Sequence, residues 1–476
     1  MNHTSTTLRA FTAGCLLLGA GISFAASSPA SIDDEALAAL QGAYARAVVP
    51  GEQSLRYQEL FATVLQRVKR SHALPVDLAG LAATAMKVVE PLPPGAGEPA
   101  EVFRKAIQEV LRTLDPHTRY LDARTHANER SESGGSFGGL GLEVESSAGA
   151  VRVVAPMPDS PAARAGLVPG DLIVRVDELP LLGVPLAEAI ARMRGEPGTP
   201  VTITIQRTPA QAGAAPAGTA QEFTVALTRD TIRRQVLRWS MEGNVLVLRL
   251  GAFSGPVSAS LAQAIAEASG EAGGVRPQAV VLDMRGNPGG LLHEAVRVAD
   301  TFLGKGDIVS LRGGSTSRQR AWQADAAELL EGVPMVVMID GRSASASELV
   351  ADALQHHGRA VVMGQRSFGK GSVQTTFPLG DERGALKLTT ALYHGPSGNT
   401  VHRVGVAPDI ELSGPAAGNS FVPAGTAPAR TAQARVDPGR CVAAARERDP
   451  GLSCALAYLR VGSVDAFVAS LADIAP

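Results

Sequence analysis

Apolar side chains recur at three-and-four spacing through much of the first 130 residues, as expected for amphipathic helices. The pattern is clearest in YQELFATVLQRVKR and PAEVFRKAIQEVLRTL, which the helix-breaking sequence PLPPG at 91–95 separates. It predicts a helical region over 32–131. The sequence DPHTRYL (Asp115–Leu121) is expected to close that helical pattern.

After the Gly-rich run GGSFGGLGLEV the sequence pattern changes: short segments in which apolar and polar residues alternate predict β-strands. The segments are LGLEVE, VRVVAP, DLIVRVD, VTITIQR and EFTVALTR. The last two flank TPAQAGAAPAGTAQ, a composition typical of a flexible hairpin insertion. We therefore expect a small β-rich domain over 136–229.

From residue 231 to 412, continuous apolar runs alternate with amphipathic helical patterns. The runs NVLVLRL, QAVVLDM, PMVVMID and AVVMG predict buried strands, and LLHEAVRVADTFL and ASELVADALQHH predict helices between them. Such alternation is typical of an α/β core with parallel strands. The stretch 413–436 is rich in Ala, Pro and Gly and predicts a low-complexity linker, and a short helical tail is expected over 437–476. The fold class is thus multidomain α+β.

Length and charge narrow the range of functions. A chain of 476 residues exceeds what one core usually supports, so several domains are expected. The formal net charge is −2 and no long basic run occurs, which argues against a nucleic-acid partner. No cofactor or metal site is predicted, because neither H-E-x-x-H nor paired C-x-x-C spacing is present.

The N-terminus has the anatomy of a signal peptide. Arg9 precedes the apolar segment 10–22, and Ser23-Phe24-Ala25 offers small residues for cleavage. The apolar segment is short for an uncleaved membrane anchor. We expect residues 1–25 to be removed and the mature protein to be exported, periplasmic and soluble. Cys441 and Cys454 would then be the only thiols, and they either form a disulfide or remain two buried free cysteines.

Two polar loops follow two of the buried strands. One is RGNPGG (Arg285–Gly290) and the other is GRSAS (Gly341–Ser345). Loops at the carboxyl ends of strands line the ligand crevice of open α/β sheets. Each loop runs into a predicted helix, so backbone N–H groups are available to a developing negative charge. The N–H of Ala346, with that of Gly289 or Gly290, is the candidate oxyanion hole.

Three serines around the second loop are candidate nucleophiles. Ser343, Ser345 and Ser347 all carry the right chemistry, and local spacing does not choose among them. Ser345 also fits a structural role, because Ser345 and Glu348 form the S-x-x-E pattern of a helix capping box.

Lys370 is the candidate base, since a buried, uncharged lysine can accept the proton of a serine hydroxyl. Gln374 lies four residues further on, so on a strand both side chains would face one side, where the amide could orient the lysine. A rival reading is the phosphate loop G-x-x-x-x-G-K at 364–370. Gly371 stands where that motif needs Ser or Thr, and SVQTTFPL predicts a strand instead of a helix.

The sequence GNPGG at 286–290 is similar to the nucleophile loop of trypsin-type proteases, but Pro288 occupies the position of the required serine. His356 and His357 do not support a trypsin-type site either. They are adjacent near a predicted helix end, where a positive charge favours the helix dipole.

The paired segments GGLGLEV and DSPAARAGLVPGDLIVRVDE resemble a PDZ domain of the bacterial protease type. The resemblance implies a peptide-end reader in which Gly139, Leu140 and Gly141 cradle a terminal carboxylate. Converging backbone N–H groups suit such an anion, and a strand edge can accept an extended peptide. The alternative is that the glycines only make a tight turn.

With DPHTRYL, LDMRGNPGG, the segment GRSASASELVADALQHHGRAVVMGQRSFGKGSVQ and ALKLTTALYHGPSGNTVHRVGVAPDI added, nearly the whole mature chain resembles the carboxyl-terminal processing proteases, serine peptidases of family S41. This resemblance implies a crotonase-like core and a Ser–Lys dyad of Ser345 and Lys370, with Gln374 in support. It also implies cleavage of exported proteins near their C-termini and a homodimer through the N-terminal helices. Some members carry an aspartate at the position of His356, whose role here stays open.

The leading hypothesis is therefore a serine endopeptidase whose PDZ-like domain captures the free C-terminus of a protein or peptide substrate. The competing hypothesis is a non-catalytic PDZ scaffold or chaperone that binds C-termini. An adaptor protein is a further partner to test for.

Overall fold

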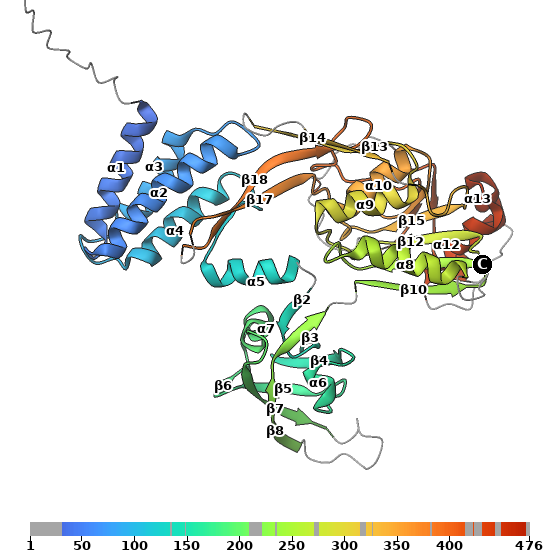
Figure 1. Ribbon diagram of the computed structural model, residues 1–476, viewed down its shortest axis with the longest axis horizontal. Coiled ribbons are helices and arrows are strands. Elements are labelled where there is room, and N and C mark those ends of the chain that lie inside the picture. Colours follow the sequence, from blue (N-terminus) through green and yellow to red (C-terminus); the bar gives the residue numbers. More distant parts are fainter. Residues whose placement is uncertain are drawn as a thin grey trace, which may run out of the picture.

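The computed structural model describes residues 31–133, 136–147, 149–208, 221–233, 236–270, 276–314, 320–325, 327–380, 383–414, 422, 431–442 and 449–472. The signal peptide expected at 1–25 and the insertion at 209–220 lie outside these residues. Figure 1 shows a helical N-terminal region, a β-rich domain below it and an α/β core that ends in the C-terminal helices.

Four amphipathic helices build the N-terminal region: α1 Ile32–Ala47, α2 Glu52–Ser71, α3 Leu78–Val89 and α4 Pro99–Arg112. Side chains cap two of them, since the Ser31 hydroxyl accepts from Asp34 N and the Glu98 carboxylate accepts from the N–H groups that open α4. The apolar faces meet in a shared core that contains the rings of Phe61 and Phe103, 4.8 Å apart. The three-and-four pattern thus predicts this region correctly.

The β-rich domain contains a six-stranded antiparallel sheet in the order β3-β4-β5-β7-β8, with β6 beside β5. Its elements are β3 Leu142–Ser147, β4 Ala150–Pro156, α6 Pro161–Arg164, β5 Leu172–Val176, β6 Leu179–Pro180, α7 Leu186–Met193, β7 Pro200–Arg207 and β8 Gln221–Thr228. A separate ribbon of β2 (Ser136–Gly139) and β9 (Asp230–Arg233) brings the chain in and out of the domain. Strand β3 is an edge strand of the described sheet.

The core is built on a seven-stranded sheet in the order β10-β11-β12-β15-β16-β19-β20. Its strands are β10 Leu237–Glu242, β11 Val245–Leu250, β12 Ala279–Asp283, β15 Met335–Ile339, β16 Val361–Gly364, β19 Ile410–Leu412 and β20 Ala434–Val436. Neighbours pair in parallel except β10 and β11, as the alternating pattern predicts. The parallel strands are buried on both faces, which explains their continuous apolar sequences.

Helices cover the two faces of this sheet. On one face lie α8 Val257–Ser269, α9 Leu292–Phe302 and α10 Ala346–His356, packed on alternate strand residues such as Leu248 and Val337. On the other lie α11 Gly439–Val442, α12 Pro450–Val461 and α13 Val464–Ala472, packed on the intervening residues such as Val281 and Met338. The C-terminal tail is therefore part of the core.

A second sheet joins the core to the helical region. It contains β1 Arg119–Leu121, β13 Gly306–Gly313, β14 Arg320–Ala324, β17 Ser372–Pro378 and β18 Ala385–His394, with β18 paired to β1, β13 and β17. The β17–β18 hairpin reaches from the core to the helices (Figure 1), where Leu386 and Leu388 complete the helical core. Helix α5 (Ala123–Ser133) then leads to β2. The helical pattern therefore does not end at DPHTRYL: part of that motif is β1, and α5 follows it.

The linker predicted over 413–436 extends too far, because its last residues belong to the core sheet. Residues Ala434–Val436 form strand β20, which pairs in parallel with β19. Three residues are too few to show a strand period within an Ala- and Pro-rich composition. Residues 415–421 and 423–430 lie outside the described residues.

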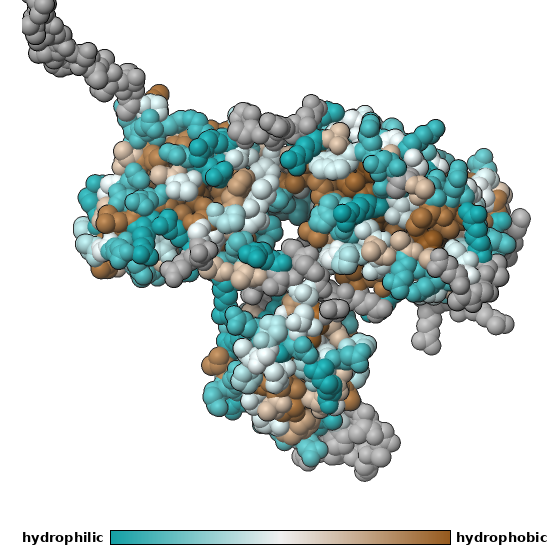
Figure 2. Space-filling model, viewed as in Figure 1, coloured by the Kyte–Doolittle hydropathy of each residue, from teal (hydrophilic) through white to brown (hydrophobic). Residues whose placement is uncertain are grey.

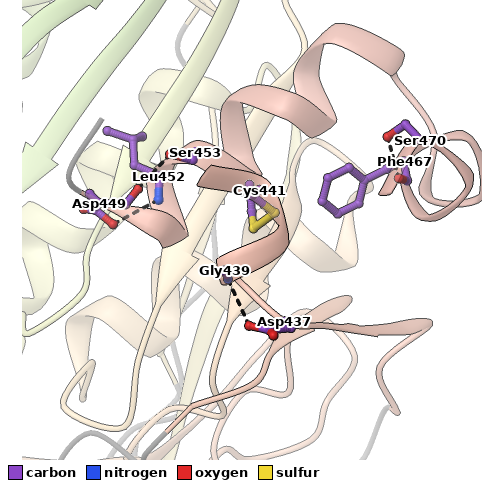
Figure 3. Close-up of a disulfide and its surroundings, with 9 residues drawn as sticks. Asp437, Gly439, Cys441, Asp449, Leu452, Ser453, Phe467 and Ser470 are labelled. Atoms are coloured by element: carbon purple, nitrogen blue, oxygen red, sulfur yellow. Dashed lines mark hydrogen bonds between the residues drawn. A yellow bond between two sulfur atoms is a disulfide. The ribbon is translucent and has the colours of Figure 1, made fainter. Parts of the chain in front are cut away.

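Cys441 and Cys454 form a disulfide that joins α11 to α12, beside Phe467 of α13 (Figure 3). Asp449 caps α12 through Leu452 N, and its carboxylate also accepts two hydrogen bonds from Arg285 in the first polar loop. The tail therefore braces that loop from the far face of the sheet.

Among the described residues, no single helix is long and apolar enough to cross a bilayer. The pair α12 and α13, bent by 115°, meets the length and composition criteria only when taken together.

Candidate active site

A cleft of about 980 Å³ opens where the core, the β17–β18 hairpin and α5 meet, and Figure 2 shows a hollow between the three parts of the molecule. All six residues predicted for catalysis and the oxyanion hole line this cleft: Gly289, Gly290, Ser345, Ala346, Lys370 and Gln374. They come from three separate segments of the chain.

Ser345 stands at the N-terminus of α10 in a strained conformation, with φ 56° and ψ −111°. A non-glycine residue rarely adopts this backbone, and such strain concentrates at functional sites. Its N–H donates to Glu348 Oε2 at 2.7 Å, which is half of the predicted capping box. Its hydroxyl makes no capping hydrogen bond, so the side chain is left to the cleft.

The other two candidate serines are buried and occupied. Ser343 Oγ donates to Met284 O at 2.9 Å, and Ser347 Oγ donates to Asn287 O at 3.0 Å. Both residues are fully buried, and neither lines the cleft. Of the three serines that spacing leaves open, only Ser345 presents its side chain to a substrate-sized space.

The Glu348 carboxylate connects the serine loop to the lysine loop. Besides Ser345 N, it accepts from Lys370 N at 2.8 Å, from Gly369 N at 2.6 Å and from Ser367 Oγ at 2.6 Å. Burial raises the pKa of Glu348 to about 7, and these hydrogen bonds oppose the rise. Glu348 thereby fixes the two backbone segments that carry Ser345 and Lys370.

Lys370 is in an environment that favours a neutral amine. Burial lowers its pKa below the ordinary value, and the positive charges of Lys387 and Arg119 lower it further, against the charges of Glu348 and Asp115. No hydrogen bond joins Lys370 Nζ to the Ser345 hydroxyl within the described part of the chain. Catalytic hydrogen bonds are often long before substrate binds.

Lys370 and Gln374 do not lie on one regular strand, although their spacing had predicted this. Lys370 lies in the loop before β17, which begins at Ser372, and a bulge between Val373 and Gln374 breaks the alternation. Both side chains nevertheless line the cleft. The loop and the bulge, and not a regular two-residue period, bring them to one side.

The glycines of the first polar loop pack directly against the segment that carries Ser345. A side chain on Gly289 would lie 2.9 Å from both Ser345 Cβ and Ala346 N. Gly289 N–H donates to Asn287 Oδ1 at 2.9 Å, whereas the N–H groups of Gly290 and Ala346 have no acceptor among the described residues. Of the two glycines, Gly290 is therefore the better oxyanion donor.

Several lining residues were not singled out from the sequence. Tyr393 is buried, donates through its hydroxyl to Lys370 O, and neighbours Ser345 closely enough for that side chain to affect its pKa, which burial raises. Glu129 of α5 pairs with Arg119 and Lys387. Tyr393 could have been suspected from the sequence, because it lies in ALKLTTALYHGPSGNTVHRVGVAPDI, a segment that resembles the S41 peptidases. No local sequence pattern points to Glu129, Arg119 or Lys387.

His356 lies elsewhere. Its side chain is exposed and lines a separate small cavity with Asp352 and Gln355, away from the serine. Among the described residues, no group of three His, Cys, Asp or Glu side chains could hold a metal ion.

The three residues of the predicted carboxylate cradle precede edge strand β3. The carbonyl oxygens of Leu140 and Gly141 accept from Ala162 N and Met157 N, while the N–H groups of both residues have no acceptor among the described residues. Gly141 has φ 71°, and a side chain there would lie 2.8 Å from Ser160 Oγ. The tight turn is thus real, and it leaves N–H groups available.

Comparison with known proteins decides the family. The model of peptidase family S41 matches residues 244–412, and that of a PDZ domain matches residues 152–207. A carboxy-terminal-processing protease of Bartonella bacilliformis is 42% identical over 315 residues, which cover 66% of this chain and 70% of that protein. The chain belongs to peptidase family S41.

This S41 peptidase is a serine-type C-terminal processing hydrolase of peptide bonds with a PDZ domain. A probable CtpA-like serine protease of Staphylococcus epidermidis is 33% identical over 66% of this chain and 61% of that protein. A solved photosystem II D1 C-terminal processing protease is 27% identical, with a TM-score of 0.48 over 76% of this chain and 94% of that one. The S41 match runs from near the start of β11 to the end of β19 and includes both polar loops, Ser345 and Lys370.

Proposed function

We propose that Ser345 and Lys370 form the catalytic dyad of this protease. Neutral Lys370 accepts the hydroxyl proton, Ser345 Oγ attacks the peptide carbonyl, and the amine leaves with a proton from Lys370. Water then hydrolyses the acyl-enzyme. Among the candidate serines, only Ser345 faces the cleft that also holds a pKa-lowered lysine, and this observation carries the proposal.

The N–H groups of Gly290 and Ala346 are proposed to bind the oxyanion of the tetrahedral intermediate. Both belong to residues that line the cleft beside Ser345, and both lack an acceptor among the described residues. Ala346 is also the first residue of α10, where the helix dipole favours negative charge. Stabilisation of this kind is worth about 3 kcal/mol per donor.

The PDZ domain is proposed to capture the free C-terminus of the substrate. Strand β3 has an open edge in the described sheet, so an extended peptide can pair with it as an added strand. The N–H groups of Leu140 and Gly141 precede that strand and suit a terminal carboxylate. The substrates would then be exported proteins with accessible tails, cleaved near their C-termini. The homodimer and the adaptor protein remain predictions.

The dyad is tested with an unfolded protein substrate and mass spectrometry of the products. Wild type is expected to give truncated chains, and Ser345→Ala and Lys370→Ala are expected to give none while keeping their thermal stability. Ser347→Ala is the matched control, because it removes a neighbouring buried hydroxyl that does not reach the cleft. Turnover by Lys370→Ala close to that of wild type would refute the assigned base.

Tail capture is tested with two peptides that differ only at the C-terminus, one a free carboxylate and one an amide. The amide is expected to raise KM with little change in kcat, because the carboxylate binds far from the reacting bond. Equal KM values for the two peptides would contradict the carboxylate cradle.

A further inference from the structure

A chain of polar side chains leads away from the cleft beneath Gln374. In the β17–β18 hairpin, Gln374 lies directly opposite Thr389. Its Nε2 donates to Thr389 Oγ1 at 3.2 Å and to Ser372 Oγ at 2.9 Å. The amide nitrogen of Gln374 is therefore directed into the hairpin. The amide oxygen, Oε1, is the polar atom of this side chain that remains available to the cleft.

The chain continues from Thr389 into the DPHTRYL segment. Thr118 Oγ1 lies 3.4 Å from Thr389 Oγ1 and accepts from Thr389 N at 3.1 Å. Thr118 Oγ1 donates to Asp115 Oδ2 at 2.6 Å, and His72 Nε2, just beyond α2, lies 3.4 Å from the same carboxylate oxygen. Thr118, Thr389 and His72 are each at most 6% exposed. Buried polar groups of this kind are fixed by their hydrogen bonds.

Hydroxyl acceptors and an ionised carboxylate fix the directions of the hydrogen bonds in this chain. Hydrogen bonds from His72 and Thr118 hold the pKa of Asp115 well below its usual range despite burial, so its carboxylate only accepts. The hydroxyl of Thr118 makes its short contact, 2.6 Å, with that carboxylate and is also the donor across the 3.4 Å contact to Thr389 Oγ1. Thr389 Oγ1 is thus an acceptor, and it faces the N–H bonds of Gln374 Nε2.

We propose that Thr389, Thr118 and Asp115 are positioning residues that lock the Gln374 amide with its oxygen available to Lys370. The proposal rests on the dyad proposed above and extends it to residues of the N-terminal region. Asp115 and Thr118 lie just before β1, the strand that pairs with β18 of the hairpin.

The orientation of the amide affects the reaction because a neutral lysine amine has one lone pair and two N–H bonds. The lone pair must face the Ser345 hydroxyl to accept its proton. An acceptor such as Gln374 Oε1 holds an N–H bond and so turns the lone pair toward the serine. A reversed amide would present its NH₂ group to the amine, and two donors cannot bind each other.

The experiment compares steady-state kinetics of the full-length protein on one peptide substrate. Thr389→Val keeps the β-branched shape of the strand residue but loses the hydroxyl, and Thr389→Ser restores the hydroxyl. Thr118→Val breaks the chain from the loop side and decides the question if Thr389→Val does not fold. Thr390→Val is the matched control, since Thr390 is the next residue of β18 and its hydroxyl lies 2.7 Å from that of Thr375.

Thr389→Val and Thr118→Val are each expected to lower kcat about tenfold with KM nearly unchanged, the effect of one net hydrogen bond at the transition state. The double variant should lose no more than either single variant, because both break the same chain. Thr389→Ser and Thr390→Val should both match wild type.

The positioning chain alone would be overturned by a Thr389→Val enzyme with wild-type kcat while Lys370→Ala is inactive, or by losses that multiply in the double variant. A fall of kcat in Thr390→Val equal to that in Thr389→Val would also overturn it, because any lost hairpin hydroxyl would then suffice. Wild-type turnover by Lys370→Ala would instead overturn the dyad and the chain that depends on it.

Discussion

Replacing Gly290 by alanine tests the oxyanion hole directly. Gly290 has φ 150°, and a Cβ there would overlap the Phe253 carbonyl oxygen and lie 2.6 Å from the Phe253 carbonyl carbon. Phe253 is fully buried and bridged to this loop by Phe253 N–H to Gly289 O and Leu291 N–H to Phe253 O. Because Phe253 is held in place, the loop 285–290 must move to relieve the overlap. This movement carries the Gly290 N–H away from the cleft.

The expected loss is that of one oxyanion donor, about 3 kcal/mol of barrier or a 100- to 1000-fold lower kcat. Gly286→Ala is the matched control in the same loop. It has φ 72°, so alanine costs about 1 kcal/mol of backbone strain. The nearest atom to its Cβ would be Arg342 Nη2 at an ordinary 3.5 Å, so no clash with the loop results.

The assay measures kcat and KM on a peptide substrate, together with thermal unfolding to show that each variant is folded. Gly286→Ala should lose some stability and keep its kcat, and Gly290→Ala should lose kcat with KM largely retained. A folded Gly290→Ala enzyme that keeps a third or more of the wild-type kcat would rule out Gly290 as an oxyanion donor. An equal loss of kcat in Gly286→Ala would rule it out as well, because any change in the loop would then suffice.

Two further predictions concern charge and the C-terminal tail. Lys370 must be neutral to act as a base, so kcat/KM should rise with pH through its lowered pKa. Lys387→Met removes a positive charge that lowers the pKa of Lys370, so the rise of kcat/KM should move to higher pH. Lys387→Arg keeps the positive charge and should leave the rise in place. An unmoved profile in Lys387→Met would contradict the charge effect. Replacing both Cys441 and Cys454 by alanine opens a loop of sequence separation 13, so denaturant unfolding of the tail should show a loss of about 3 kcal/mol. Unchanged unfolding would show that packing alone holds the tail.

Local patterns in the sequence were sufficient for many of the elements, although helix α8 and strands β13 and β18 were not predicted. Helices such as α2 and α4 and strands such as β12 and β15 were predicted because their periodicity reflects burial on one face or on both. The three-residue strands β1 and β20 were missed, because a strand this short carries no period and forms only where a partner strand is already in place.

The candidate site could be predicted only in part from the sequence. The sequence placed Ser345 among three candidate serines, and the S-x-x-E pattern even favoured a capping role for it. The structure separates the three by the accessibility of their hydroxyls, two of which are buried and bonded to backbone oxygens. Lys370 was predicted as the base, but the regular strand spacing expected between it and Gln374 is absent, because Lys370 precedes β17 and a bulge precedes Gln374.

By itself, the amino-acid sequence determined the conformation of the strongly periodic segments, the order of the domains and the set of residues able to carry the chemistry. Only the tertiary structure decided which hydroxyl faces the cleft and which charges surround the lysine. Arg119 and Lys387 come from β1 and β18, and Asp115 and Thr118 from the segment leading into β1, all brought together by the pairing of distant strands. Periodicity records which face of an element is buried, whereas the pKa of a side chain depends on neighbours that are distant in sequence.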